Sequence, residues 1–178
     1  MNKPKKIRIY LIILVALIVF FIALPRIVDN VSITEGSPIE MEPVTLESTD
    51  LIRYSVDRLD PITVNGQDIF YLWGWSFLTT DMEQGNYDIY LVFKSDEAEY
   101  YYLTESFERP DLQKAFPEVE IDLSNSGFKA FIAKEKIEVG EYAIGIIYKN
   151  KSDGTTYYQL TNKEIVRTPN TISLEIKQ

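Results

Sequence analysis

Tyrosine is the residue type in this sequence with the clearest capacity for binding chemistry. The chain has 178 residues, of which 12 are tyrosine and none is histidine or cysteine. Tyr100, Tyr102 and Tyr157 fall in predicted strands. An exposed tyrosine ring stacks on sugars or partner proteins through a large apolar plane with a polar tip. We therefore identify these three as candidate binding residues. The alternative is that half of the cluster faces the core and the rest forms cross-strand pairs.

The other residue types give little support for catalysis. Without histidine or cysteine, an acid–base or nucleophilic site would need carboxylates, serine, lysine or tyrosine. Most of the 27 acidic residues must be solvated, and the sequence contains neither a Gly-x-Ser-x-Gly motif nor a phosphate-binding loop. We expect a protein that is not an enzyme and that binds no cofactor.

Charged residues supply two further candidate groups. Arg109 and Asp111 are candidate binding residues, with a structural ion pair as the alternative. Glu118, Glu120 and Asp122 would share one face of an extended segment and offer oxygen ligands to Ca²⁺. Because no EF-hand spacing organises these carboxylates, a solvated strand face is the favoured interpretation, and we predict no metal site.

The strands that position these side chains are predicted by runs of aromatic and β-branched residues, which turn residues separate. They predict strands at residues 51–59, 69–78, 87–93, 100–107, 127–133, 142–149, 156–160, 164–166 and 172–176. The pattern is typical of an all-β fold, and we expect an Ig-like antiparallel β-sandwich of seven to nine strands.

Two local expectations concern the arrangement of these segments. Residues 69–78 (IFYLWGWSFL) are so apolar that they predict a central strand covered on both sides, paired with residues 87–93 across the turn pair Gly85-Asn86. Residues 109–116 predict one short crossover helix between the sheets, begun by Pro110 and Asp111 and ended by Pro117.

The N-terminal residues predict insertion into a membrane. Residues 1–8 carry four basic side chains, and residues 9–24 contain no charged one. We expect a cytoplasmic tail at 1–8, a transmembrane signal-anchor helix at 9–28, a polar spacer at 29–50 and an extracytoplasmic domain at 51–178. A cleavable signal peptide is the alternative, although the small-x-small cleavage site is missing.

Charge restricts the partners of the exported part. With 14 basic and 27 acidic residues, residues 26–178 carry a net charge of −13. Such a domain repels polyanions, so we expect no nucleic acid among its partners. The lack of cysteine excludes disulfides and is common in exported domains of Gram-positive bacteria.

A series of short motifs in the middle of the chain resembles a bacterial cell-surface β-sandwich module. The motifs are Gly74-Trp75, Arg109-Pro110-Asp111-Leu112 with Ala115-Phe116-Pro117, Asn125-Ser126-Gly127-Phe128 and Gly140-Glu141-Tyr142. The chain departs from the module's pattern at Val139, where a proline often precedes the corner glycine. The resemblance implies a fold, a cell-surface location and envelope polysaccharide as a neighbour.

Together these expectations describe a membrane-anchored, extracytoplasmic, non-catalytic interaction or scaffold module of the bacterial cell envelope. Its expected partners are the membrane, through the N-terminal helix, and envelope proteins or polysaccharide. The alternative function is a carbohydrate-binding accessory domain that recognises envelope polysaccharide through surface tyrosines.

Overall fold

The computed structural model describes residues 36–41, 48–64, 66–80 and 84–176 of the chain. The predicted tail at residues 1–8 and the predicted transmembrane helix at residues 9–28 lie outside this part. Among the described residues, no helix has the length and apolar character needed to cross a membrane.

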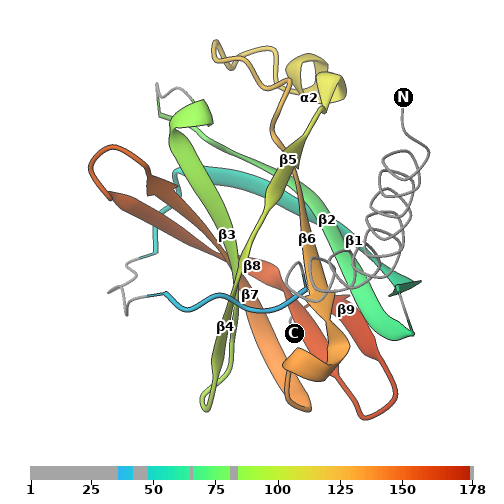
Figure 1. Cartoon of the computed structure of the whole chain (residues 1–178). Coiled ribbons are helices and arrows are strands. Elements are labelled where there is room, and N and C mark those ends of the chain that lie inside the picture. The colour runs from blue at the N-terminus through green and yellow to red at the C-terminus, as the bar shows by residue number, and fades with distance from the viewer. Residues whose placement is uncertain (1–35, 42–47, 65, 81–83, 177–178) are drawn as a thin grey trace, which may run out of the picture. The chain divides into compact units, whose positions relative to one another are not determined.

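The described residues form two antiparallel sheets that pack face to face (Figure 1). One sheet has the strand order β1-β2-β6-β5 and the other β4-β3-β7-β8-β9. The nine strands of the described part are β1 (Ile52–Val64), β2 (Gln67–Leu78), β3 (Tyr87–Lys94), β4 (Glu99–Leu103), β5 (Glu105–Phe107), β6 (Gly127–Ala133), β7 (Gly140–Asn150), β8 (Thr156–Arg167) and β9 (Ile172–Ile176). The predicted all-β sandwich is confirmed.

Strand β2 lies inside the four-stranded sheet, between β1 and β6. It follows β1 through a short connection in which Gly66 has a φ of +81°, a conformation that glycine adopts without steric cost. Phe70 and Leu72 point into the core. Because side chains alternate along a strand, Tyr71 and Trp73, which directly follow them, point to the opposite face of the sheet.

The predicted pairing of residues 69–78 with residues 87–93 is wrong. β2 pairs with β1 and β6, whereas β3 pairs with β4 and β7 in the other sheet. The short β1–β2 connection makes β1 the hairpin partner of β2. The expected turn pair Gly85-Asn86 lies in a 3₁₀ helix, η1 (Gln84–Asn86), at the start of β3.

The chain changes sheets between β4 and β5, at the single residue Thr104. The backbone N–H and the Oγ1 hydroxyl of Thr104 both donate to the carbonyl of Ile89, each at 2.9 Å. The helix α2 (Pro110–Ala115) follows β5 and precedes β6, which are neighbours in one sheet. The predicted helix is therefore present, but its predicted crossing between the sheets is wrong.

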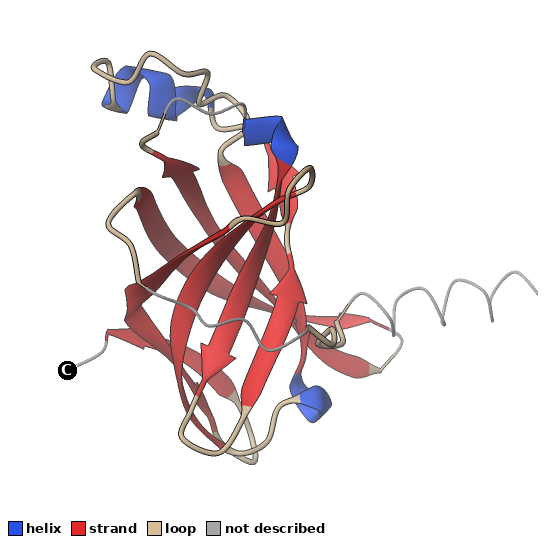
Figure 2. Cartoon of the chain, turned by 90° about the vertical axis from the view of Figure 1, so that its left-hand side faces the viewer, coloured by secondary structure: helices blue, strands red, loops and turns tan. Residues whose placement is uncertain are grey.

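The two ends of the sandwich carry different connections. Both views place α2 and the loop after it at one end and the 3₁₀ helix η2 (Lys134–Lys136) at the other (Figures 1 and 2). We call residues 108–126, which connect β5 to β6 and include α2, the α2 excursion. It covers one end of the outer face of the four-stranded sheet.

The core lies between the sheets and takes the inward side chains of both. Leu72, Phe93, Phe128 and Ile144 are among those with no exposed surface. Phe128 packs so closely on β2 that a Cβ on Gly74 would collide with its ring, which explains the glycine in the Gly74-Trp75 pair.

The described residues before β1 pair with strands of both sheets. Gly36 accepts a hydrogen bond from the backbone N–H of Ala133 at 2.8 Å, and the N–H of Ile39 donates to the carbonyl of Tyr101 at 2.8 Å. Nearer β1, Ser48 forms a parallel bridge with Tyr158. These contacts give strand edges backbone partners. The described residues of the predicted spacer at 29–50 thus share one compact unit, Gly36–Gln178, with the strands.

Candidate functional site

The outer face of the four-stranded sheet carries four aromatic side chains, which we call the aromatic row. They are Tyr71 and Trp73 on β2, Phe131 on β6 and Phe107 on β5. All four are half-buried, whereas Leu72, between the two β2 rings, has no exposed surface. Because successive side chains alternate across a strand, the row faces away from the core.

The rings of the aromatic row touch one another in sequence. The centroids of Tyr71 and Phe131 are 4.5 Å apart at an interplanar angle of 67°, and those of Tyr71 and Trp73 are 6.0 Å apart at 50°. Phe107 meets Trp73 edge-on, with 5.3 Å between centroids. Such inclined contacts are favourable for aromatic quadrupoles. They form one continuous, ridged apolar surface.

Two cations lie over ring faces of the row. The guanidinium carbon of Arg58 is 5.1 Å from the centroid of Trp73, and Nζ of Lys129 is 5.2 Å from that of Phe131. The Arg58 side chain is 62% exposed. A cation at this distance is attracted by the negative face of the ring. The exposed Arg58 side chain therefore lies between the Trp73 ring and solvent.

Two carboxylates complete the polar border of the row. Asp60 lies 3.0 Å from Nε of Arg58, and Glu105 lies 2.8 Å from Nζ of Lys129. The four charges cancel, so this border is neutral although residues 26–178 carry a net charge of −13. Exposed pairs of this kind add little to stability. They do place hydrogen-bond donors and acceptors beside the rings.

The same outer face is covered at its other end. Trp75 stacks on Phe77 with 5.8 Å between centroids and meets Phe116 of the α2 excursion at 5.2 Å. Phe77 has no exposed surface, and Leu112 of α2 is 2% exposed. The α2 excursion therefore converts this end of the face into a second small core and leaves the aromatic row beyond it.

Arg109 and Asp111 form the ion pair that the sequence predicted. The guanidinium of Arg109 donates to both carboxylate oxygens of Asp111, at 2.9 and 2.8 Å, and to Asp57 of β1 at 3.2 Å. The Arg109 bonds lower the pKa of Asp111. These contacts tie the α2 excursion to β1 and match the structural alternative for the pair.

The predicted binding tyrosines lie on the inward side of the five-stranded sheet. Tyr102 is 2% exposed and packs 5.1 Å from Phe93, and burial raises the pKa of its hydroxyl. Tyr100 and Tyr157 both pack against the main core. The expectation of exposed rings therefore differs from the structure, because strand alternation turns Tyr100 and Tyr102 inward together.

A second apolar surface lies on the outer face of the five-stranded sheet. We call it the outer patch; its residues are Tyr90, Val92, Tyr101, Ile147, Tyr158 and Leu160. Val92 and Ile147 have no exposed surface and Tyr158 is 8% exposed. Burial, aided by a hydrogen bond to Glu99, raises the pKa of Tyr101 to about 12. Tyr90, Tyr101 and Leu160 are half-buried, as the rings of the aromatic row are, but this patch is centred on buried side chains.

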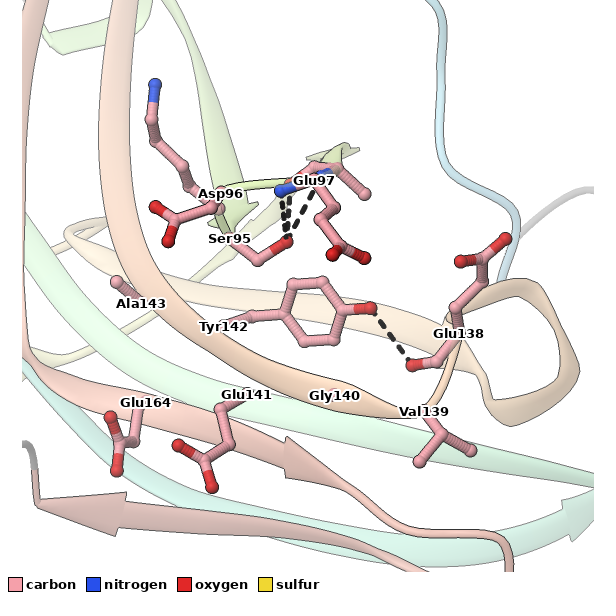
Figure 3. Close-up of a pocket in the computed structure, with 12 residues that line it drawn as sticks. Ser95, Asp96, Glu97, Glu138, Val139, Gly140, Glu141, Tyr142, Ala143 and Glu164 are labelled. Atoms are coloured by element: carbon pink, nitrogen blue, oxygen red, sulfur yellow. Dashed lines mark hydrogen bonds between the residues drawn. The ribbon is translucent and has the colours of Figure 1, made fainter.

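An acidic hollow of about 430 Å³ lies beside the β3–β4 turn and the start of β7 (Figure 3). The hydroxyl of Tyr142 donates to the carbonyl of Glu138 at 3.0 Å, and Ser95 Oγ accepts backbone N–H groups of the turn. The carboxylates that line it are Asp96, Glu97, Glu138, Glu141 and Glu164. Within the described part of the chain, no three acidic side chains are arranged to hold a metal ion.

The predicted acidic strip belongs to the α2 excursion and is not extended. Residues 117–124 contain no strand. Glu118 lies 3.6 Å from Arg53, and Asp122 accepts the backbone N–H of Ser124 at 2.9 Å. Hydrogen bonding by the side chain and then the backbone of Ser124 lowers the Asp122 pKa. The shared face expected of Glu118, Glu120 and Asp122 does not form.

Comparisons of the chain with protein-family models, curated proteins and solved structures find no match. The geometry of the described residues alone therefore supports the choice of site.

The sequence interpretation missed the aromatic row. Residues 69–78 were predicted to be covered on both sides, which holds only for the end that contains Trp75 and Phe77. The available signal was the period-two spacing of Tyr71 and Trp73, matched by Lys129 and Phe131 in the strand at 127–133.

Proposed function

We propose that this chain is a membrane-anchored, non-catalytic interaction module of the bacterial cell envelope, with its β-sandwich on the extracytoplasmic side. The observation that carries the proposal is the aromatic row, a contiguous set of half-buried rings on an outer sheet face. Contiguous apolar patches on the surface of a domain mark places where another molecule binds. The row acts by contact, and it requires no catalytic group.

Membrane attachment rests on the N-terminal sequence. Four basic residues precede sixteen residues without charge, and a cytoplasmic position of the basic flank puts the domain on the opposite side. Arg26 follows Pro25 where a signal peptide would need small residues for cleavage. We therefore propose that the segment at residues 9–28 stays attached as an anchor.

An Ig-like topology for the sandwich is supported by the strand order. The order β1-β2-β6-β5 corresponds to A-B-E-D of Ig domains, and β4-β3-β7-β8 corresponds to C′-C-F-G. Tyr142 at the start of β7, the F position, donates its hydroxyl to the carbonyl of Glu138. A bond of this kind is the tyrosine corner of such domains. The Gly140-Glu141-Tyr142 motif supplies that corner.

A side-chain contact between the two sheets also joins β2 and β7, which are the strands at the B and F positions. Ser76 on β2 and Tyr148 on β7 form a buried hydrogen bond of 2.8 Å between the sheets. In antibody domains a disulfide joins these two strands. A polar pair is suited to a chain without cysteine, because both buried hydroxyls are satisfied.

Localisation of the full chain in its native host tests the membrane part of the proposal. We expect the chain to sediment with membranes, to resist extraction by alkaline carbonate and to lose its β-sandwich when protease is added outside intact, wall-stripped cells. Recovery in the soluble cytoplasmic fraction, or full protection from external protease, would contradict the proposal. A cytoplasmic marker protein that survives the same treatment provides the control for lysis.

Contact through Tyr100, Tyr102 and Tyr157, the alternative drawn from the sequence, is not supported by the packing of these rings. Tyr102 is 2% exposed, so a ligand reaches it only after the sheets separate. The aromatic row takes the place of these tyrosines as the proposed contact surface.

A further inference from the structure

We propose that the aromatic row is a glycan-binding surface, on which pyranose rings of an uncharged polysaccharide stack on Tyr71 and Trp73. The inference rests on the proposed function, because it names the class of ligand for the same surface. It is carried by the orientation of the ring faces, the polar border, the balance of charge and the size of the surface.

The faces of two rings in the aromatic row already attract positively charged groups. Solvated Arg58 occupies the face of Trp73, and Lys129 that of Phe131, at 5.1 and 5.2 Å. A ring face attracts cations because it is the negative part of the aromatic quadrupole. The C–H groups on the flat side of a pyranose are weakly positive and meet the same face. A sugar therefore replaces the Arg58 side chain over Trp73 without a change in the sheet.

The charged side chains that border the aromatic row supply hydrogen-bonding groups beside the rings. A pyranose presents hydroxyl groups around an apolar ring, so its site needs an apolar platform edged by donors and acceptors. Asp60 and Glu105 supply carboxylate acceptors, and Arg58 and Lys129 supply donors, all on strands that flank or carry the row. Charged groups form stronger hydrogen bonds than neutral ones do. Stacking on the rings of the row thus sets the plane of the sugar, and hydrogen bonds from the border set the positions of its hydroxyl groups.

Charge restricts the glycan to an uncharged one. The two cations and two carboxylates at the row cancel, and residues 26–178 carry a net charge of −13. A polyanionic polymer meets repulsion from the whole domain with no local cationic excess to offset it. A neutral polysaccharide has no such cost.

The size of the surface favours a glycan over a folded protein. Aromatic side chains bury 150–250 Å² each, so four half-buried rings leave at most roughly 400 Å² exposed between them. A stable protein–protein interface needs roughly 800 Å² from each partner. The α2 excursion covers the adjoining rings and limits the apolar surface on that side. The row matches one or two sugar units.

Tryptophan fluorescence gives a direct test, because the chain contains two tryptophans, Trp73 and Trp75. In the full-length Trp75→Phe variant, purified in detergent, Trp73 is the sole tryptophan and is excited selectively at wavelengths that the 12 tyrosines do not absorb. The probes are chitohexaose, cellohexaose and yeast mannan, each titrated alone, with polygalacturonate as the charged comparison. We expect a saturable change in Trp73 emission with at least one neutral probe and none with polygalacturonate.

Two matched variants in the Trp75→Phe background separate stacking from folding. Tyr71→Leu removes a ring of the row but keeps apolar volume, and we expect about tenfold weaker binding. Tyr90→Leu makes the same change on the outer patch, and we expect unchanged affinity. Thermal unfolding of both variants verifies that the sandwich is intact.

Three results would overturn the inference: no neutral probe changes Trp73 emission, Tyr71→Leu binds as tightly as its parent, or polygalacturonate binds as well as the neutral probes. If the row retains an envelope protein and no glycan, the inference fails while the proposed function stands. If the chain proves to be cytoplasmic, the proposed function fails even where the sugar titration succeeds.

Discussion

The two outer faces of this sandwich both carry aromatic side chains, but they differ in burial. On the five-stranded sheet, Val92 and Ile147 have no exposed surface. On the four-stranded sheet, Tyr71, Trp73 and Phe131 remain half-buried, with the exposed Arg58 over Trp73 and Lys129 over Phe131. The outer patch is therefore built around buried side chains, with Tyr90, Tyr101 and Leu160 half-buried at its margin, whereas every ring of the aromatic row is half-buried.

The difference shows that the number of aromatic residues does not identify a binding surface. Tyr100, Tyr101 and Tyr102 are consecutive, and all three pack against cores of the domain. The described residues before β1 contact two of the three strands that carry outer-patch tyrosines, at Tyr101 and Tyr158. The three consecutive tyrosines thus differ from the aromatic row in resting against buried side chains of their own domain.

The largest expected difference between the two faces is in stability. Ile147→Ala removes a fully buried side chain from the outer patch, so we expect the free energy of unfolding to fall by about 3 kcal/mol. Phe131→Ala on the aromatic row removes more atoms but leaves a smaller cavity, and we expect less than half that loss. Urea denaturation of both variants measures the two values. Equal losses would contradict the contrast in burial.

Gly145→Ala sharpens the same contrast by adding a single methyl group. A Cβ at this position would collide with the ring of Tyr158 and lie 2.8 Å from Cγ1 of Val92. We expect a loss of about 1–3 kcal/mol, as is usual for overpacking. The control is Gly85→Ala, because a Cβ there meets nothing within 4 Å. A Gly145→Ala variant as stable as the Gly85→Ala control would show that the outer patch is loosely packed.

Alkaline pH should weaken the outer patch through Tyr101. Its pKa is about 12 in the folded domain against about 10 in an unfolded chain, so the unfolded state loses its proton first. The stabilising contribution is complete below about pH 10 and is lost as the pH rises through 12. We expect Tyr101→Phe to reduce the fall in melting temperature between pH 9 and pH 11. An unchanged pH dependence would contradict this role of Tyr101.

The smallest expected effect on stability comes from the border of the aromatic row. Arg58 is exposed, so Arg58→Ala should lower the free energy of unfolding by at most about 1 kcal/mol. It should, however, uncover Trp73 and increase acrylamide quenching of Trp73 emission in the Trp75→Phe background. Unchanged quenching would mean that Arg58 does not cover the indole in solution.

Much of the fold could be predicted from local patterns in the sequence. Turn residues and period-two runs located the strands, and Pro110 and Asp111 located α2. The partners of each strand could not be predicted in the same way. Pairing of β2 with β6 and the change of sheet at Thr104 depend on contacts between segments far apart in the chain.

The candidate site was predicted less well than the fold. Alternation indicates that Tyr100 and Tyr102 share a face, but it does not tell which face is buried. The same limit applies to Tyr71 and Trp73, whose exposure depends on how far the α2 excursion extends over the sheet. Arg109 and Asp111 were paired correctly because their contact is local, two residues apart.

Co-sedimentation with purified cell envelopes of the native host tests the central claim most directly. The full chain is compared with its Tyr71→Leu and Tyr90→Leu variants, each verified as folded, after solubilisation in detergent. We expect the wild-type chain and Tyr90→Leu to sediment with the envelopes while Tyr71→Leu stays largely in solution. Equal sedimentation of all three, or loss with Tyr90→Leu alone, would contradict the assignment of the aromatic row as the contact surface.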